Sequence, residues 1–342
     1  MNAEEGRKLL NGTKVHAVAI QKGGTGKTTI TSGLCYTLAK MGYKVLAIDS
    51  DPQASLSSLC NVDIVQKDIL GLQSIYERYV QGLREFRLIS FEEIKDVIRK
   101  PEYKSPVPRK LEYQIKQFGF DLIPANIILA NYDLVLNHIE DEIEGEGTRI
   151  QTYKERIKRT SGQTLMFIVD LIKNSYDYDF IFIDTCPGLN MLAYNAICAS
   201  TDGVIVPINL EPMTINGAEN LINTTSQIQL ALQKLGKNHK GILGVVKNQY
   251  APRLKIQKRF DDVVETFFPI PSFETTIPSK TSCDIAHDEG RLYSEYDSKI
   301  GKIFKELADE IVAEDIRRAD EKETVVVKEF GKTVWEAVNK NK

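Results

Sequence analysis

The sequence has no run of 18 or more apolar residues, so we expect no transmembrane helix. Residues 1–14 are polar and lack an apolar core, which excludes a signal peptide in this segment. The cysteines are odd in number and have no metal-ligand spacing: they are Cys35, Cys60, Cys186, Cys198 and Cys283. Such scattered cysteines are typical of a protein of the reducing cytoplasm, where we expect this one to work.

The composition shows no strong bias of any other kind. Hydrophobic residues make up 42% and charged residues 27% of the chain, and the net charge is −3. These values are ordinary for a globular protein and argue neither for nor against a nucleic-acid partner. The 342 residues suffice for one large α/β domain or two small ones.

The most informative stretch is a strand, a glycine-rich loop, a helix and a second strand. Val15–Ile20 is a short apolar run of the kind that forms a buried parallel strand, and the loop Lys22–Thr28 follows it. Val45–Ile48 reads as a second buried strand, ending at Asp49 and Asp51. Between them, apolar residues recur at helical spacing: Ile30, Leu34, Leu38 and Met41. This order predicts a nucleoside-triphosphate site.

The loop lacks the first glycine of the ordinary phosphate-loop pattern, because Gln21 stands in its place. From Lys22 it reads K-G-G-T-G-K-T, which is the deviant Walker A form. On these residues the sequence resembles the ParA/MinD group of ATPases, and most closely the ParA-type partition ATPases.

Each loop position has a chemical role. Backbone N–H groups can cradle phosphate oxygens, and Lys27 can place its charge between the β- and γ-phosphates. The Thr28 hydroxyl can bind Mg²⁺, and Thr29 can donate to the α-phosphate. The resemblance implies that Lys22 reaches the nucleotide of a second protomer. The predicted nucleotide-binding residues of this loop are Gly23, Gly24, Thr25, Gly26, Lys27, Thr28 and Thr29.

Two carboxylates follow the second strand, in the stretch D-S-D-P-Q-A-S. Asp49 and Asp51 are two residues apart, so on a strand both side chains lie on one face. The ParA family has a similar D-x-D-P-Q stretch. By this resemblance Asp51 orients or activates the hydrolytic water, and Asp49 supports the Mg²⁺ shell.

A third carboxylate ends another buried strand. Residues 178–188 read YDFIFIDTCPG, which places Asp184 as a Walker B residue that can hold Mg²⁺ through water. The family pattern is D-x-P-P, and Gly188 stands here in place of the second proline. The metal role is unaffected, but the stiffness of the segment that follows stays open.

The base of the nucleotide has one candidate contact. Asn248 follows the apolar strand Ile242–Val246, and the family resemblance implies that an asparagine here reads the adenine edge. The sequence contains no N-K-x-D motif for guanine. The sequence therefore favours ATP over GTP, with ATP and Mg²⁺ as the cofactors.

No acidic residue occurs between Glu219 and Asp261, although the protein is acidic overall. A basic segment of this kind is either a set of solvated helix ends or a surface for a phosphate backbone. Because the family binds DNA without sequence preference through this half of the chain, we favour DNA. The predicted DNA-binding residues are Lys247, Arg253, Lys255, Lys258, Arg259 and, farther on, Lys280.

We expect the chain to have three parts, the second of which carries an insert. We expect a polar arm at residues 1–13 and an ATPase domain at residues 14–320. Within that domain, residues 62–118 form a variable helical insert, which is either peripheral packing or a partner-binding surface. Residues 321–342 can form a tail helix with one apolar face; we expect it to pack on the domain or on a partner, since its match to a membrane-binding helix is weak.

The resemblance implies an α/β fold with a doubly wound, mostly parallel sheet of seven or eight strands, flanked by helices. It implies a Mg²⁺-dependent ATPase that is weakly active alone and forms an ATP-sandwich homodimer. The dimer would bind DNA non-specifically on the nucleoid and drive plasmid or chromosome partition with a centromere-binding ParB-like partner. The alternative is a MinD-like positioning ATPase that cycles on membranes. The predicted catalytic residues are Lys22, Lys27 and Asp51; the predicted metal-binding residues are Thr28, Asp49 and Asp184.

Overall fold

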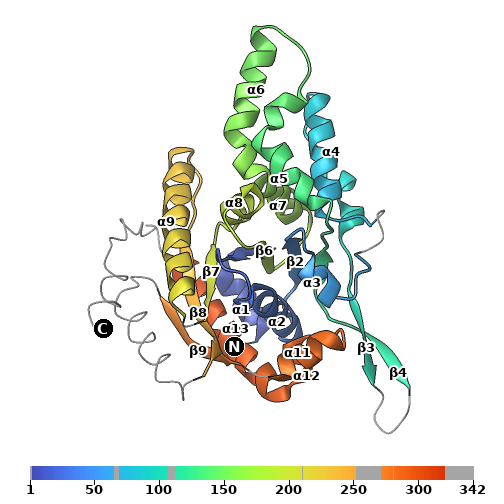
Figure 1. The fold of residues 1–342 in the computed structure, drawn as a ribbon, viewed down its shortest axis with the longest axis vertical. Coiled ribbons are helices and arrows are strands. Elements are labelled where there is room, and N and C mark those ends of the chain that lie inside the picture. Colours follow the sequence, from blue (N-terminus) through green and yellow to red (C-terminus); the bar gives the residue numbers. More distant parts are fainter. Residues whose placement is uncertain are drawn as a thin grey trace, which may run out of the picture.

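The computed structural model describes residues 2–64, 69–106, 112–209, 211–251, 271–279 and 281–319. In these residues seven strands form one sheet in the order β5-β2-β6-β1-β7-β8-β9, and every neighbouring pair is parallel (Figure 1). The strands are β1 Lys14–Val18, β2 Val45–Ser50, β5 Asp121–Ile123, β6 Phe180–Thr185, β7 Gly203–Ile208, β8 Ile242–Tyr250 and β9 Ser272–Pro278. The predicted doubly wound parallel sheet is confirmed.

Helices cover both faces of this sheet. On one face lie α1 Ala3–Leu10, α2 Lys27–Lys40, α11 Thr281–Asp288, α12 Tyr293–Tyr296 and α13 Ser298–Ala319. On the other lie α4 Leu72–Arg84, α5 Leu129–Asn137, α7 Thr164–Ser175, α8 Met191–Ala199 and α9 Pro212–Lys234. Every residue of the four central strands is buried, which explains why they read as unbroken apolar runs rather than alternating ones.

The strand order reverses at β1. The chain passes from β1 to β2 on one side, and β7 later pairs with β1 on the other side. In open α/β sheets a ligand binds outside the carboxyl ends of the strands at such a reversal. The loop after β1 therefore occupies the position that this architecture offers to a ligand.

The segment predicted as a polar arm contains helix α1. Ala3, Gly6 and Leu10 are buried, and the helix packs against α13. Asn2 caps it, and Arg7 pairs with Asp179 at 2.9 Å. Residues 2–13 therefore extend the main domain in the described structure.

The predicted helical insert at residues 62–118 contains α4 but also an antiparallel hairpin. Its strands are β3 Glu102–Pro106 and β4 Tyr113–Gln117, and it projects from the body of the domain (Figure 1). Tyr103 stacks on Phe118 with ring centroids 4.6 Å apart, which anchors the base of the hairpin. Helix α6 Thr148–Thr160 extends alongside α4 at the opposite end of the molecule (Figure 1).

Short 3-10 helices connect the longer elements. They span Phe91–Glu93, Lys95–Val97, Ile139–Glu142 and Ser161–Gln163. No helix among the described residues is long and apolar enough to cross a membrane. The tail helix predicted at residues 321–342 lies outside the described residues.

A buried histidine joins β1 to α13 and predicts a pH dependence of stability. Nε2 of His16 lies 2.9 Å from Oδ2 of Asp315, and both side chains are fully buried. Burial lowers the pKa of His16, but the charges of Asp315 and Asp202 outweigh it, so the pKa is raised. A raised folded-state pKa stabilises the fold fully below the unfolded pKa of about 6.5, and this contribution is lost as pH rises through the folded pKa.

We therefore expect the free energy of unfolding to fall as pH rises above about 6.5. Urea titrations of the wild type and of His16→Gln at intervals from pH 6 to 9 measure this. The decline should be smaller in His16→Gln, which cannot titrate at this position. Equal pH profiles for the two proteins would show that the His16–Asp315 pair does not cause the pH dependence of the free energy of unfolding.

Candidate nucleotide-binding and catalytic site

The loop between β1 and α2 has the backbone of a phosphate cradle. Gly24 and Gly26 have φ angles of 74° and 89°, in the left-handed region that side chains disfavour. Helix α2 begins at Lys27, so its free N–H groups and the positive end of its dipole point at the loop. The predicted glycine-rich turn thus has the shape that an anion requires.

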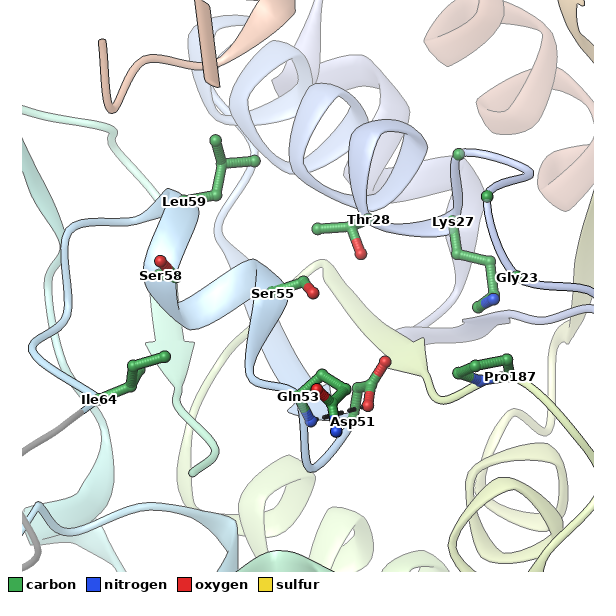
Figure 2. Close-up of a pocket in the computed structure, with 12 residues that line it drawn as sticks. Gly23, Lys27, Thr28, Asp51, Gln53, Ser55, Ser58, Leu59, Ile64 and Pro187 are labelled. Atoms are coloured by element: carbon green, nitrogen blue, oxygen red, sulfur yellow. Dashed lines mark hydrogen bonds between the residues drawn. The ribbon is translucent and has the colours of Figure 1, made fainter. Parts of the chain in front are cut away.

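The loop opens onto a cavity of about 600 Å³. Figure 2 shows Lys27 and Thr28 on the loop side of this space, with Asp51 and Gln53 across from them. The structure therefore brings together the loop and the carboxylate after β2, as the sequence predicted. Its lining residues are Gly23, Gly24, Gly26, Lys27, Thr28, Asp51, Gln53, Ser55, Ser58, Leu59, Ile64 and Pro187.

Lys27 is a buried cation. Its side chain is 7% exposed, and Nζ donates to the Lys22 carbonyl at 3.4 Å. Burial lowers the pKa of Lys27, and the carboxylates of Asp184 and Asp51 oppose that shift. A desolvated ammonium of this kind gains most from a phosphate in the adjoining cavity.

Asp184 and Thr28 form an oxygen-rich pair at the end of β6. The Thr28 hydroxyl donates to Asp184 Oδ2 at 2.7 Å, and Thr31 donates to Oδ1 at 3.2 Å. Burial and the nearby Asp49 charge raise the pKa of Asp184 to about 8. Hydroxyl and carboxylate oxygens suit Mg²⁺, and a divalent cation offsets the mutual repulsion of the two buried carboxylates. The residues therefore fit the predicted metal.

Asp49 has a structural role that the sequence did not indicate. Its Oδ1 accepts from the Asp51 N–H at 3.1 Å. Its Oδ2 accepts from the N–H and the hydroxyl of Ser57 at 2.9 and 2.7 Å. Burial raises the pKa of Asp49 to about 6. Asp49 thus shapes the turn that carries Asp51, and its role in the Mg²⁺ shell stays a prediction.

Asp51 lies at the rim of the cavity. It is 8% exposed, and Oδ1 accepts from the Gln53 N–H at 2.9 Å, which fixes the carboxyl group (Figure 2). A carboxylate held on the cavity side opposite Lys27 is placed to accept a hydrogen bond from a water that attacks a bound phosphate.

Lys22 does not line the cavity of its own protomer in the described structure. Its Nζ forms an ion pair with Glu211 at 2.5 Å, and its side chain is 29% exposed. Glu211 immediately precedes α9. Its pairing with Lys22 was not predicted, because no local pattern links two residues so far apart in the sequence.

In the segment after Asp184, Gly188 stands where the family pattern has proline, and its backbone conformation explains the difference. Gly188 has φ of 98°, and its N–H donates to the Gln21 carbonyl at 3.0 Å. Proline fixes φ near −65° and has no N–H, so it could neither adopt this conformation nor make this bond. The glycine thus holds the segment by a hydrogen bond to the residue before the phosphate loop.

Two of the predicted nucleotide contacts lie beside the loop. Thr29 lies in the first turn of α2, next to Thr28. Asn248 is 4% exposed, and its Nδ2 donates to the Thr25 carbonyl at 2.7 Å. The predicted reading of adenine by Asn248 stays a prediction.

Of the predicted DNA-binding residues, the described part of the chain includes Lys247 alone. Lys247 is 6% exposed within β8, so it offers little to an external phosphate. The remaining candidates lie outside the described residues: Arg253, Lys255, Lys258, Arg259 and Lys280. The sequence did not reveal that Lys247 is buried, because a parallel strand buried on both faces lacks the alternation of apolar and polar residues that marks the exposed positions.

The sequence interpretation missed several cavity residues. Gln53 and Ser55 directly follow Asp51, so their closeness in sequence was a usable signal. Ser58 and Leu59 share the short helix α3 Ser55–Leu59, which turns back over the cavity. Ile64 belongs to the variable insert, and nothing in its local sequence indicated this place.

Comparison with known proteins agrees with this geometry. A family model described as "AAA domain" matches residues 13–237, more than half of the chain. The sporulation initiation inhibitor protein Soj of Bacillus subtilis strain 168 is 27% identical over 303 residues, 88% of this chain and 98% of Soj. The chromosome partitioning protein ParA of Caulobacter vibrioides strain NA1000 / CB15N is 25% identical over 307 residues, 89% and 96% of the two chains.

A solved structure gives the same fold. Cobyrinic acid a,c-diamide synthase from Mycobacterium smegmatis, with bound ATP analogue and magnesium, has a TM-score of 0.61 and 21% identity. The match covers 93% of this chain and all of the other. Nucleotide and Mg²⁺ fit the loop, the buried carboxylates and the cavity described above. The chain belongs to this AAA-domain family and is a ParA/MinD-type ATPase.

Proposed function

We propose that this ATPase partitions a plasmid or chromosome: ATP joins two protomers into a sandwich dimer, the dimer binds DNA non-specifically, and a centromere-binding partner stimulates hydrolysis. Two findings support this proposal: the similarity of the chain to Soj and to the chromosome partitioning protein ParA, and the deviant Walker A loop. The cycle would occur on the nucleoid in the cytoplasm, without membrane binding.

The observation that supports dimerisation is the position of Lys22. Its ammonium group pairs with Glu211 outside the cavity of its own loop, whereas Lys27 already occupies the inner side. A second lysine that stands at the loop but does not line its own cavity would be placed to reach the phosphates of an opposing protomer. ATP would then contribute to the interface itself.

The residues of the site would divide the work of hydrolysis. Lys27 would neutralise developing charge on the phosphates, and Lys22 of the opposing protomer would add a second cation. Thr28 and Asp184 would hold Mg²⁺, which supplies further neutralisation. Asp51 would orient the attacking water, since its carboxyl group is fixed by Gln53. Slow hydrolysis without a partner would follow from an incompletely assembled site.

DNA binding would depend on the dimer. The predicted DNA-binding set of one protomer offers only a few basic side chains on a chain of net charge −3, and two aligned protomers would double the phosphates contacted. We assign these contacts to Arg253, Lys255, Lys258 and Arg259. Lys280 would join them. About six contacts give a salt slope of about −5, so binding should collapse between roughly 50 and 200 mM salt.

Lys22→Ala tests this coupling. The variant should still bind ATP but should neither dimerise nor bind random-sequence DNA, because the cation that bridges the protomers is gone. Light scattering and mobility shifts with ATP measure both properties. Lys44→Ala, which removes an exposed lysine paired with Asp177 on another part of the fold, is the matched control and should behave as wild type. Tight DNA binding by the nucleotide-free monomer would contradict the proposal.

A further inference from the structure

The carbonyl groups of the phosphate loop are held by side chains of the protein. The Gly24 carbonyl accepts from Gln249 Nε2 at 3.3 Å, and the Thr25 carbonyl accepts from Asn248 Nδ2 at 2.7 Å. The peptide unit is planar and trans, so a C=O that points one way turns the N–H of the same unit the opposite way. Holding these two carbonyls therefore orients the N–H groups of Thr25 and Gly26.

Orientation matters here because the backbone of the loop binds anions through its N–H groups and not through its carbonyls. A carbonyl oxygen that turned into the cavity would repel a phosphate and would leave one N–H fewer to bind it. The neighbouring Lys22 carbonyl is likewise occupied, by Lys27 Nζ. The donors at the end of β8 thus keep two further peptide units in the phosphate-binding orientation.

Asn248 is built tightly into the loop. Its side chain is almost wholly buried, and a β-carbon placed on Gly26 would lie 2.0 Å from Nδ2. Gly26 therefore leaves the space that the amide fills. The Asn248 side chain cannot leave this position without opening a gap behind the loop.

Gln249 reaches the same loop through an unusual backbone. Successive side chains of a strand point to opposite faces, so Asn248 and Gln249 should diverge. Gln249 instead has φ of 53°, in the left-handed region that a glutamine rarely adopts. Both amides consequently donate to adjacent carbonyls of one turn. Backbone strain at such a position persists only where the surrounding contacts stabilise it.

We propose that Asn248 and Gln249 are positioning residues of the phosphate loop, which set its affinity for the triphosphate group of any nucleotide. This rests on the nucleotide binding that the proposed function requires, and it assigns Asn248 a task other than reading adenine. Each amide acts through the loop backbone. The end of β8 is thereby a part of the phosphate site.

Three ligands separate the two roles of Asn248: ATP, GTP and inorganic tripolyphosphate, each with Mg²⁺. Asn248→Ala should weaken the binding of all three ligands by the same factor, about tenfold, because the Thr25 carbonyl loses its hydrogen-bond donor. Gln249→Ala should weaken all three by a smaller common factor, about threefold, because this bond is longer and exposed. Isothermal calorimetry measures the dissociation constants.

Asn220→Ala is the matched control. Its amide donates to the Gln21 side chain at 3.2 Å, close to the loop but not to a loop carbonyl, so all three affinities should be unchanged. Gln249→Ala keeps the test decisive if Asn248→Ala fails to fold, since the Gln249 side chain is exposed.

The outcomes are distinct. If Asn248→Ala weakens ATP but not tripolyphosphate, Asn248 reads the base and the positioning role is wrong. Wild-type affinity in both variants for all three ligands would also overturn it, while leaving the proposed function intact. Failure of the wild-type protein to bind any of the three would instead overturn the proposed function.

Discussion

Lys27→Ala should abolish measurable ATP binding. Lys27 lies buried beside the cavity, with the Lys22 carbonyl as its hydrogen-bond acceptor. Charge-assisted bonds to phosphate are worth about 1.5–3 kcal/mol each, and this amine can serve two phosphates. Their loss corresponds to a roughly 100- to 10,000-fold weaker affinity. Isothermal calorimetry with Mg²⁺ and ATP measures it.

The fold itself should tolerate the loss of this charge. Burial lowers the pKa of Lys27, which means that the folded protein holds its ammonium at a cost. The melting temperature without nucleotide should therefore not drop by the amount expected for an ordinary core residue. Lys40→Ala, at the exposed end of the same helix, is the control and should bind ATP normally. Unchanged ATP affinity in Lys27→Ala would refute the phosphate-loop assignment.

The nucleotide site was predictable because its parts are short and contiguous. The loop from Lys22 to Thr28 has the glycine spacing that suits a tight anion-binding turn. Asp49 and Asp184 each directly follow an apolar run, and Asp51 lies two residues beyond Asp49. Parallel strands bring their carboxyl ends to one edge of the sheet. The apolar runs and the glycine and aspartate residues that bound them were therefore enough to predict which segments line the cavity.

The remaining parts depend on contacts between distant residues. The ion pair of Lys22 with Glu211 and the bond from Asn248 to the loop join segments roughly 200 residues apart, and no local pattern encodes them. The hairpin β3–β4 was not predicted, because the insert was read as helical from the residues before Pro101, and the prolines that follow hide the alternation of a strand. Helix α1 was missed because its buried face is small residues and a single leucine.

The sequence placed Asp49 correctly but did not indicate its structural role in the turn after β2. The spacing of Asp49 and Asp51 placed both at the strand end, and the structure agrees. Only the fold reveals that Asp49 accepts bonds from Ser57 and from the Asp51 backbone. A variant of Asp49 would therefore disturb the turn and the metal together, which makes Asp51 the better probe of hydrolysis.

Asp51→Ala should bind ATP and Mg²⁺ within about twofold of the wild type and lose turnover. The side chain is not needed to cradle phosphate, because the loop and Lys27 do that. Removing a group that positions or activates the nucleophile costs about 100- to 10,000-fold in rate. Single-turnover hydrolysis at saturating ATP, with affinity measured separately, distinguishes binding from chemistry.

Asp51→Asn sharpens this test. The asparagine side-chain oxygen can still accept the bond that Oδ1 now receives from the Gln53 N–H, so the turn should be preserved while the negative charge is removed. Equal loss of turnover in both variants would assign the effect to the carboxylate rather than to the turn. Asp170→Asn, an exposed carboxylate on α7, controls for the change in net charge and should hydrolyse ATP at the wild-type rate. Wild-type turnover in Asp51→Asn would mean that Asp51 only shapes the turn, and the water would need another partner within the cavity.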